Sequence, residues 1–295
     1  MSRLFFLILL LFSTAARAET CRPHLVMEAP LRLDALFFSV PVTLDGHEAG
    51  MLLDTGSEGS LVTPEGAELL KLPQDRRHLT MLDGGSGRGT LSPNLIVSSL
   101  RIGTLDLGAQ SMPLGALPGL PLVTPPILGL LGGNIWRGLD LELDAPHHVV
   151  RFWSTPAGCA DAPDWTGAFT TLPARRIGDR LLVPFVLDGV RGMALVDSGA
   201  RSHIVSRDFA RRLGVSDAVL ARDPGGVTSG VDLHARLYAW HRFGQLRLGN
   251  EVWDKPVLTV SMIQDGVDML LGADWFARRD VWLAYASGRV FVRGE

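Results

Sequence analysis

Two stretches of the sequence, Leu52-Leu53-Asp54-Thr55-Gly56-Ser57 and Leu195-Val196-Asp197-Ser198-Gly199-Ala200, repeat one pattern 143 positions apart. In each stretch an apolar run ends at an Asp, which is followed by a hydroxyl residue and a position that is Gly in both copies. Asp in this setting is common in turns, so a single copy would carry little information. Two copies are informative because they predict that two carboxylates occupy the same local structure.

The similarity extends well beyond these stretches. At the same offset Leu44-Asp45-Gly46 aligns with Leu187-Asp188-Gly189, and each Asp-Gly pair is typical of a tight hairpin turn. At an offset of 140, Leu130-Leu131-Gly132-Gly133-Asn134 aligns with Leu270-Leu271-Gly272-Ala273-Asp274. Because the order of these landmarks is the same in both halves, the chain is predicted to contain two copies of one module rather than a short-period solenoid.

The repeated motifs resemble those of the aspartic peptidases. The modules are compact and similar to retropepsins, and they are joined in one two-lobed chain as in pepsin-like enzymes. The resemblance implies a mainly β fold, a bilobal acid-protease-like double β-barrel whose lobes are related by a pseudo-twofold axis, each with one or two short helices. The expected divisions are a signal peptide at 1–18, a first lobe at 19–153, a Pro- and Gly-containing linker at 154–176 and a second lobe at 177–295.

The predicted chemistry depends on Asp54 and Asp197. If the lobes pack about the axis, these carboxylates face each other about 3 Å apart, share one proton and titrate as a coupled pair. The charged carboxylate can then activate a water while the protonated one polarises the scissile carbonyl, so the expected activity is that of an aspartic endopeptidase acting on extended polypeptides. No cofactor and no metal are expected. The resemblance assigns supporting roles to the neighbours Thr55, Gly56, Ser57, Ser198, Gly199 and Ala200.

The two copies differ at Ser57 and Ala200. We expect the Ser57 hydroxyl to donate a hydrogen bond to Asp54, a bond that Ala200 cannot make to Asp197. Fewer donors stabilise the ionised form less, so the hypothesis is activity that extends into weakly acidic pH. Arg201, which follows Ala200, either faces outward or, if it points inward, lowers the pKa of Asp197.

Two glycine-rich segments, 83–89 and 223–230, separate strand-like sequences in corresponding parts of the halves. They are interpreted either as surface hairpin turns or, as the resemblance implies, as flaps that fold over the substrate. The residues expected at the flaps are Gly84, Gly85, Ser86, Gly87, Gly225, Gly226 and Thr228.

The N-terminus is typical of a secretory signal. Arg3 precedes the apolar run Leu4 to Phe12, and Ala16-Arg17-Ala18 has small residues where signal peptidase cleaves. The chain is therefore similar to exported bacterial members of the family, with a periplasmic or secreted location, although a retained anchor is an alternative. In an oxidising compartment Cys21 and Cys159 are expected to form a disulfide, the alternative being two unrelated thiols.

Composition limits the possible partners. The formal net charge of −3 gives no electrostatic reason to expect nucleic-acid binding, and no segment after residue 18 is long and apolar enough to span a membrane. Since both lobes lie in one chain, a monomer is expected. A rival hypothesis keeps the fold without the turnover, as an envelope module that binds peptides or a protein partner.

Overall fold

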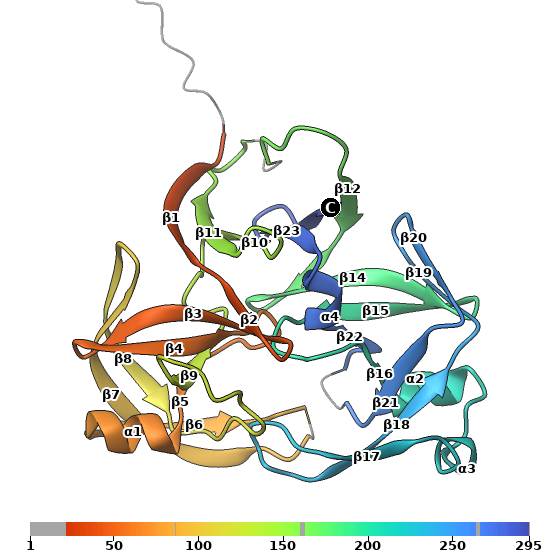
Figure 1. The fold of residues 1–295 in the computed structure, drawn as a ribbon, viewed down its shortest axis with the longest axis horizontal. Helices are drawn as coiled ribbons and strands as arrows, with labels where there is room; N and C mark the ends of the chain where they lie inside the picture. Colours follow the sequence, from red (N-terminus) through yellow and green to blue (C-terminus); the bar gives the residue numbers. More distant parts are fainter. Residues whose placement is uncertain (1–21, 86, 160–162, 264–265, 295) are drawn as a thin grey trace, which may run out of the picture.

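The structure is a computed structural model that describes residues 22–85, 87–159, 163–263 and 266–294. The fold is mainly β and has two lobes, which Figure 1 shows side by side beneath a sheet that contains strands from both. The fold class that the resemblance implies is confirmed.

The first lobe is an eight-stranded sheet. Its elements are β2 (Arg32–Asp34), β3 (Phe37–Leu44), β4 (His47–Leu53), β5 (Leu61–Val62), α1 (Pro64–Leu70), β6 (Gln74–Leu82), β7 (Thr90–Ile102), β8 (Leu105–Pro113) and β9 (Ile127–Leu131). The predicted Asp45-Gly46 turn joins β3 to β4, and both of its residues have positive φ. Strand β4 runs parallel to β9, and β5 pairs antiparallel with β9 on its other side.

The second lobe repeats this arrangement. Its elements are β13 (Arg175–Ile177), β14 (Arg180–Leu187), β15 (Val190–Val196), β16 (Ile204–Ser206), α2 (Arg207–Arg212), α3 (Asp217–Leu220), β17 (Gly225–Thr228), β18 (Arg236–Arg242), β19 (Gln245–Leu248), β20 (Glu251–Asp254), β21 (Val257–Ser261), β22 (Met269–Leu271) and α4 (Ala273–Phe276). Strand β15 runs parallel to β22, and β16 pairs antiparallel with β22, as β4, β9 and β5 do.

The first helix of each lobe begins where the sequence predicts. The Thr63 side chain caps α1 by accepting a hydrogen bond from the backbone N–H of Gly66, and Ser206 caps α2 in the same way from Phe209. Since a hydroxyl cap satisfies a backbone donor that the helix leaves free, a short helix can start there with little help from the rest of the chain.

A six-stranded sheet joins the lobes in the order β1-β11-β10-β23-β24-β12. Its strands are β1 (His24–Pro30), β10 (Asp140–Asp144), β11 (Val149–Ser154), β12 (Thr170–Pro173), β23 (Arg279–Ala284) and β24 (Arg289–Gly294). The lobes meet where β10 pairs with β23. Strand β12 falls inside the predicted linker and pairs with β24, so this part of 154–176 belongs to the sheet. The pairing register of β12 is set by β24, which lies over a hundred residues further along the chain.

The expected signal peptide, residues 1–18, lies outside the described residues. Cys21 does too, so its bridge to Cys159 stays a prediction. Among the described residues, none of the helices combines the length and the apolar character that a membrane crossing requires.

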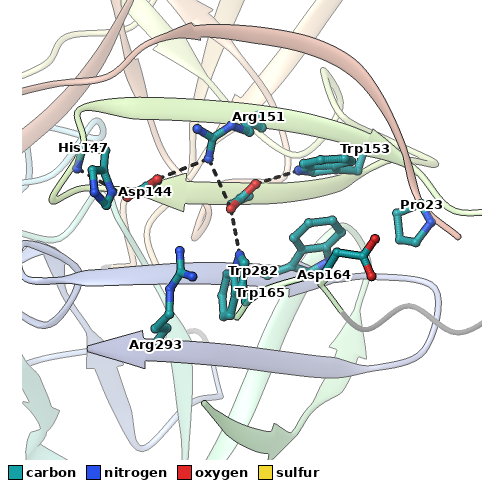
Figure 2. A pocket seen from close by; sticks show the side chains of 10 residues that line it. Pro23, Asp144, His147, Arg151, Trp153, Asp164, Trp165, Trp282 and Arg293 are labelled. Carbon is teal, nitrogen blue, oxygen red and sulfur yellow. Dashed lines mark hydrogen bonds and ion pairs between the residues drawn. The ribbon is translucent and has the colours of Figure 1, made fainter. Parts of the chain in front are cut away.

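The outer face of the six-stranded sheet carries buried charges beside a cavity of about 430 Å³ (Figure 2). Arg151 lies 3.3 Å from Glu142 and 3.2 Å from Asp144, and the indole N–H groups of Trp153 and Trp165 also donate to Glu142. None of the residues that line this cavity belongs to the two Asp-Thr/Ser-Gly loops.

Asp280 completes this group of carboxylates. Ligand oxygens of Glu142, Asp144 and Asp280 lie within 4.8 Å of one another, and Arg293 donates to Asp280 at 2.6 Å. Burial, followed by the charges of Glu142 and Asp144, raises the pKa of Asp280 to about 7. Because the two arginines already pair with these carboxylates, ion pairing and a bound proton account for the cluster.

We expect Asp280→Asn to flatten the pH dependence of stability. The pKa of Asp280 in the folded protein, about 7, lies above its ordinary value of 3.8, so the folded state holds this proton more tightly. The stabilisation is therefore complete below about pH 4 and is lost as pH rises toward 7. Thermal unfolding midpoints from pH 4 to 8 should fall less steeply in Asp280→Asn than in the wild type.

The control for this measurement is Asp164→Asn, which removes an exposed carboxylate with 75% of its side-chain surface accessible. Parallel pH curves for wild type and Asp280→Asn would contradict the assignment of this proton to Asp280.

Candidate active site

Asp54 and Asp197 lie directly after the ends of β4 and β15. Each loop is fixed to the neighbouring parallel strand, because the Asp54 N–H donates to Leu131 O and the Asp197 N–H donates to Leu271 O, both at 3.0 Å. The two loops therefore leave their sheets in the same way, as the repeat predicts.

Glycines let a second segment pass behind each loop. A Cβ at Gly132 would lie 2.2 Å from the carbonyl oxygen of Gly59, and one at Gly272 would lie 2.4 Å from that of Ser202. Any larger residue would push the crossing chains apart, so the repeated Gly is required by packing.

Thr55 and Ser198 join the two loops through four buried hydrogen bonds. The Thr55 N–H donates to Ser198 Oγ at 3.1 Å, and the Ser198 N–H donates to Thr55 Oγ1 at 3.0 Å. Thr55 Oγ1 donates to Val196 O at 2.8 Å, and Ser198 Oγ donates to Leu53 O at 2.6 Å. Each hydroxyl is thus donor and acceptor at once, and each reaches the strand of the opposite lobe.

Each carboxylate packs against the glycine of the other lobe. A Cβ at Gly56 would fall within 2.9 Å of all three carboxyl atoms of Asp197, and one at Gly199 would fall within 2.6 Å of those of Asp54. The two Asp side chains therefore meet at the lobe interface, and only glycine leaves room for them.

Asp197 is buried and Asp54 is partly buried, and their electrostatic surroundings differ. The pKa of Asp54 is raised well above its usual value, first by burial and then by the charge of Asp197 and a hydrogen bond with it. The backbone N–H groups of Gly56 and Ser57 lower this pKa but do not cancel the rise. Burial also raises the pKa of Asp197, but the amides of Ala200 and Gly199, the Asp54 hydroxyl and the charge of Arg180 oppose it. Asp197 accepts hydrogen bonds from two amides, those of Gly199 and Ala200, and lies in the field of Arg180, so its surroundings favour the ionised form.

The expected role of the Ser57 hydroxyl is wrong. Ser57 Oγ donates to Gly59 O at 2.8 Å, closing its own turn rather than contacting Asp54. The backbone stabilises the carboxylates instead: the Ala200 N–H donates to Asp197 at 3.1 Å, and that bond needs no hydroxyl. The difference between Ser57 and Ala200 therefore does not set the acidity of the pair.

Sequence reasoning considered Arg201 and missed Arg180. Arg201 reaches across to the first lobe, where its Nε donates to Ala35 O at 3.2 Å and its guanidinium lies 5.3 Å from the centre of the Phe37 ring. Arg180 is the cation that acts on Asp197, and it also pairs with Glu58 of the first lobe at 3.4 Å. Arg180 lies 17 positions before Asp197, and only the packing of β14 brings it near.

The first glycine-rich segment is the tip of a hairpin, as expected. The last residue pair between strands β6 and β7 is Leu82 with Thr90, so the turn consists of 83–89 and contains Gly84, Gly85 and Gly87. Ser86 lies outside the described residues.

The tip of the second hairpin was predicted at the wrong place. Gly225, Gly226 and Thr228 lie in β17 and pair with β18, and the turn is formed by 229–235. Glycines suggested a turn, but Gly225 is a strand residue whose Cβ would lie 2.1 Å from Tyr238 O, so close strand contact explains it.

Two apolar clusters lie beside the carboxylates, separate from the main core. The first cluster consists of Phe37, Leu52, Leu61, Ile127 and Leu130, with Leu117, Leu120, Val123 and Val231 packed on it. The second cluster consists of Leu182, Leu195, Ile263 and Val267, with Met193, Ile204 and Leu270 packed on it. Leu52 and Leu195 precede the two Asp residues by two positions, on the strand face opposite Leu53 and Val196 of the core.

Comparison with known proteins agrees with this geometry. A bilobal β fold that brings one carboxylate from each lobe to a shared interface is the architecture of acid proteases. The family model described as aspartyl protease matches residues 40–135 and 183–275, more than half of the chain, and the chain belongs to this family.

A curated relative, DNA damage-inducible protein 1 of Neurospora crassa, is 31% identical to this chain over 109 residues. The match covers 37% of this chain and 24% of the relative, so the chain spans only a small part of that protein's length.

We expect Thr55→Val to lower the free energy of unfolding by about 1–3 kcal/mol, because it keeps the shape of the side chain but leaves the Ser198 N–H and Val196 C=O unsatisfied in a buried site. Ser57→Ala is the matched control: its hydroxyl is exposed, and its loss should cost less than about 1 kcal/mol. Denaturant titration measures both. Equal small losses would show that the hydrogen bonds between the lobes contribute little.

Proposed function

We propose that the protein is an aspartic endopeptidase that hydrolyses peptide bonds in extended polypeptides, with Asp54 and Asp197 as the catalytic residues. One observation carries the proposal: each carboxylate packs against the glycine of the opposite lobe, while the Thr55–Ser198 hydrogen bonds hold the two loops together. Holding two carboxyl groups against each other in a desolvated site costs folding free energy, and an arrangement of this kind is typical of catalytic sites.

The mechanism follows from the unequal environments. Asp197, stabilised as an anion by two amides and Arg180, holds a water and takes its proton as the water attacks the scissile carbonyl carbon. Asp54, which keeps its proton, donates a hydrogen bond to the carbonyl oxygen and protonates it as the tetrahedral intermediate forms. When the intermediate collapses, Asp197 gives the proton that it took from the water to the leaving nitrogen, and Asp54 recovers a proton from the gem-diol as the C–N bond breaks. The pair returns to its starting protonation state, and no covalent intermediate with the protein is needed.

The two apolar clusters support a substrate with apolar side chains on both sides of the scissile bond. One cluster lies beside each carboxylate, and alternate side chains of an extended peptide point to opposite sides. The two hairpins, β6–β7 and β17–β18, supply backbone groups that can pair with the peptide as added strands.

Activity is proposed to extend into weakly acidic pH, although the difference between Ser57 and Ala200 is not the reason. Burial raises the pKa of both carboxylates, so the singly protonated pair persists above the pH at which exposed carboxyl groups have lost their protons.

We also propose that the protein is exported and cleaved after Ala18, because Arg3, the apolar run at 4–12 and Ala16-Arg17-Ala18 form a complete signal. N-terminal sequencing of protein recovered from the periplasm or medium should begin at Glu19. Recovery of the chain from the membrane fraction with Met1 intact would favour the retained anchor instead.

The central test uses Asp54→Asn and Asp197→Asn with an unfolded polypeptide substrate from pH 3 to 7. Each variant should lose about 10²–10⁴-fold in kcat/KM, because neither can share the proton or activate the water. A statine-type inhibitor should block the wild type. Asp208→Asn, which removes a carboxylate with 81% of its side chain exposed, is the control and should cleave normally.

Cleavage that survives in either Asn variant would remove the pair from the mechanism. Peptide binding by the wild type without cleavage at any pH would favour the envelope binding module.

A further inference from the structure

The tip of the second hairpin, residues 229–235, reaches the first lobe. The Gly84 N–H, at the tip of the first hairpin, donates to Asp232 Oδ2 at 3.1 Å, and Asp232 Oδ1 accepts from the His234 N–H at 3.1 Å. Asp232 is only 6% exposed, so its carboxylate is enclosed by the contact that it makes. The two tips meet at the lower centre of Figure 1, between β6 and β17.

Glycines make this contact close. A Cβ at Gly84 would lie 2.9 Å from Asp232 Cγ and 2.9 Å from the Val231 backbone nitrogen, and one at Gly230 would lie 2.8 Å from Gly84 O. The two tips therefore touch through their backbones, which a larger residue at either position would prevent.

The same contact places Val231 against the first lobe. Val231 packs on the first apolar cluster, the one that contains Leu52 and Leu130 beside Asp54. Its neighbour Leu233 is 59% exposed and does not belong to that cluster. One apolar side chain of this tip is thus directed to the surface beside Asp54, and another is directed to solvent.

The second apolar cluster has no such cover. Among the described residues of 83–89, none packs on the cluster of Leu195, Ile204 and Leu270 beside Asp197. Gly84, Gly85 and Gly87 have no side chain to extend there. The duplication has therefore produced unequal surroundings for the two carboxylates.

We propose that Val231 is a specificity-determining residue. The hydrogen bond between Asp232 and Gly84, called the clasp below, holds Val231 over the apolar surface beside Asp54. Val231 restricts this side of the site to smaller apolar side chains than those that the side beside Asp197 accepts. The inference rests on the proposed peptidase function. Asp232 acts as a positioning residue, since it touches the opposite hairpin and fixes where Val231 lies.

The specificity part is tested by mapping cleavage sites in a proteome-derived peptide mixture with wild type, Val231→Ala and Leu233→Ala. Val231→Ala should raise kcat/KM about tenfold for peptides that carry a large aromatic residue on one particular side of the scissile bond. It should leave kcat/KM unchanged for peptides that carry such a residue on the other side. Leu233→Ala removes a similar apolar side chain from the same tip and should leave the cleavage profile unchanged. Identical profiles for all three proteins, or a change on both sides at once, would overturn the assignment of Val231.

The clasp is tested without substrate by hydrogen exchange. In Asp232→Ala the amides of 82–89 should exchange about tenfold faster, because the Gly84 N–H loses its acceptor. Asp232→Asn keeps one acceptor oxygen for the Gly84 N–H but turns an NH2 donor toward the His234 N–H, so it should retain only part of the protection. Asp223→Ala is the control, as it removes a carboxylate at the base of the same hairpin, where it pairs with His241.

The two measurements separate the possible failures. Wild-type exchange in Asp232→Ala would overturn the clasp whether or not the protein is a peptidase. Faster exchange in a protein that cleaves nothing would keep the clasp and reject the proposed activity, and with it the role of Val231 in specificity. Loss of folding in Asp232→Ala would be recognised by faster exchange throughout the chain, and Asp232→Asn would then carry the test. Partial loss of protection at 82–89 in that variant would support the clasp, and full wild-type protection would overturn it.

Discussion

The burial of two carboxylates against each other is the constraint on which the rest of the structure depends. Burial raises the pKa of both groups, so each must be supplied with donors or a proton to remain in place. The donors are backbone amides at fixed positions after each Asp, which are available only if the loop turns sharply and carries glycine where the opposite carboxylate approaches. The motif Asp-Thr/Ser-Gly meets these demands within three consecutive residues.

Placing both lobes in one chain lets equivalent positions diverge. At the offset of 143, Phe37 corresponds to Arg180 and Glu58 to Arg201. These four residues form two different contacts between the lobes, an ion pair of Glu58 with Arg180 and a cation–π contact of Arg201 with Phe37. A symmetric dimer would have to make the same contact twice. Of these two arginines, Arg180 is the one whose charge acts on Asp197, so equivalent positions in the two lobes now affect the carboxylate pair differently.

The sequence predicted those features that depend on local structure. The Asp45-Gly46 turn, the Thr63 cap and the position of each Asp after an apolar strand require only neighbouring residues, and the repeat supplied the two-lobed plan. Strand β12 lies in the segment expected to be a linker, and the turn at 229–235 was predicted several residues too early, because partner strands elsewhere in the chain set the register of both segments. The Ser57 hydroxyl could satisfy either Asp54 or its own turn, and the sequence does not distinguish two acceptors at similar reach.

The lobes are held together at more than one place, and this limits how the site can open. The Thr55–Ser198 bonds fix the loops at the carboxylates, while the pairing of β10 with β23 joins the sheets, with Arg151 and Arg293 compensating the charges beside it. Rotating one lobe against the other would break both sets at once, including buried hydrogen bonds that solvent does not replace. The contacts described above between the hairpin tips are of another kind: a carboxylate on a backbone N–H, close backbone approach at glycines, and the packing of Val231. Movement that admits an extended peptide therefore belongs to the hairpins, whose glycines tolerate it, and leaves the carboxylate pair undisturbed.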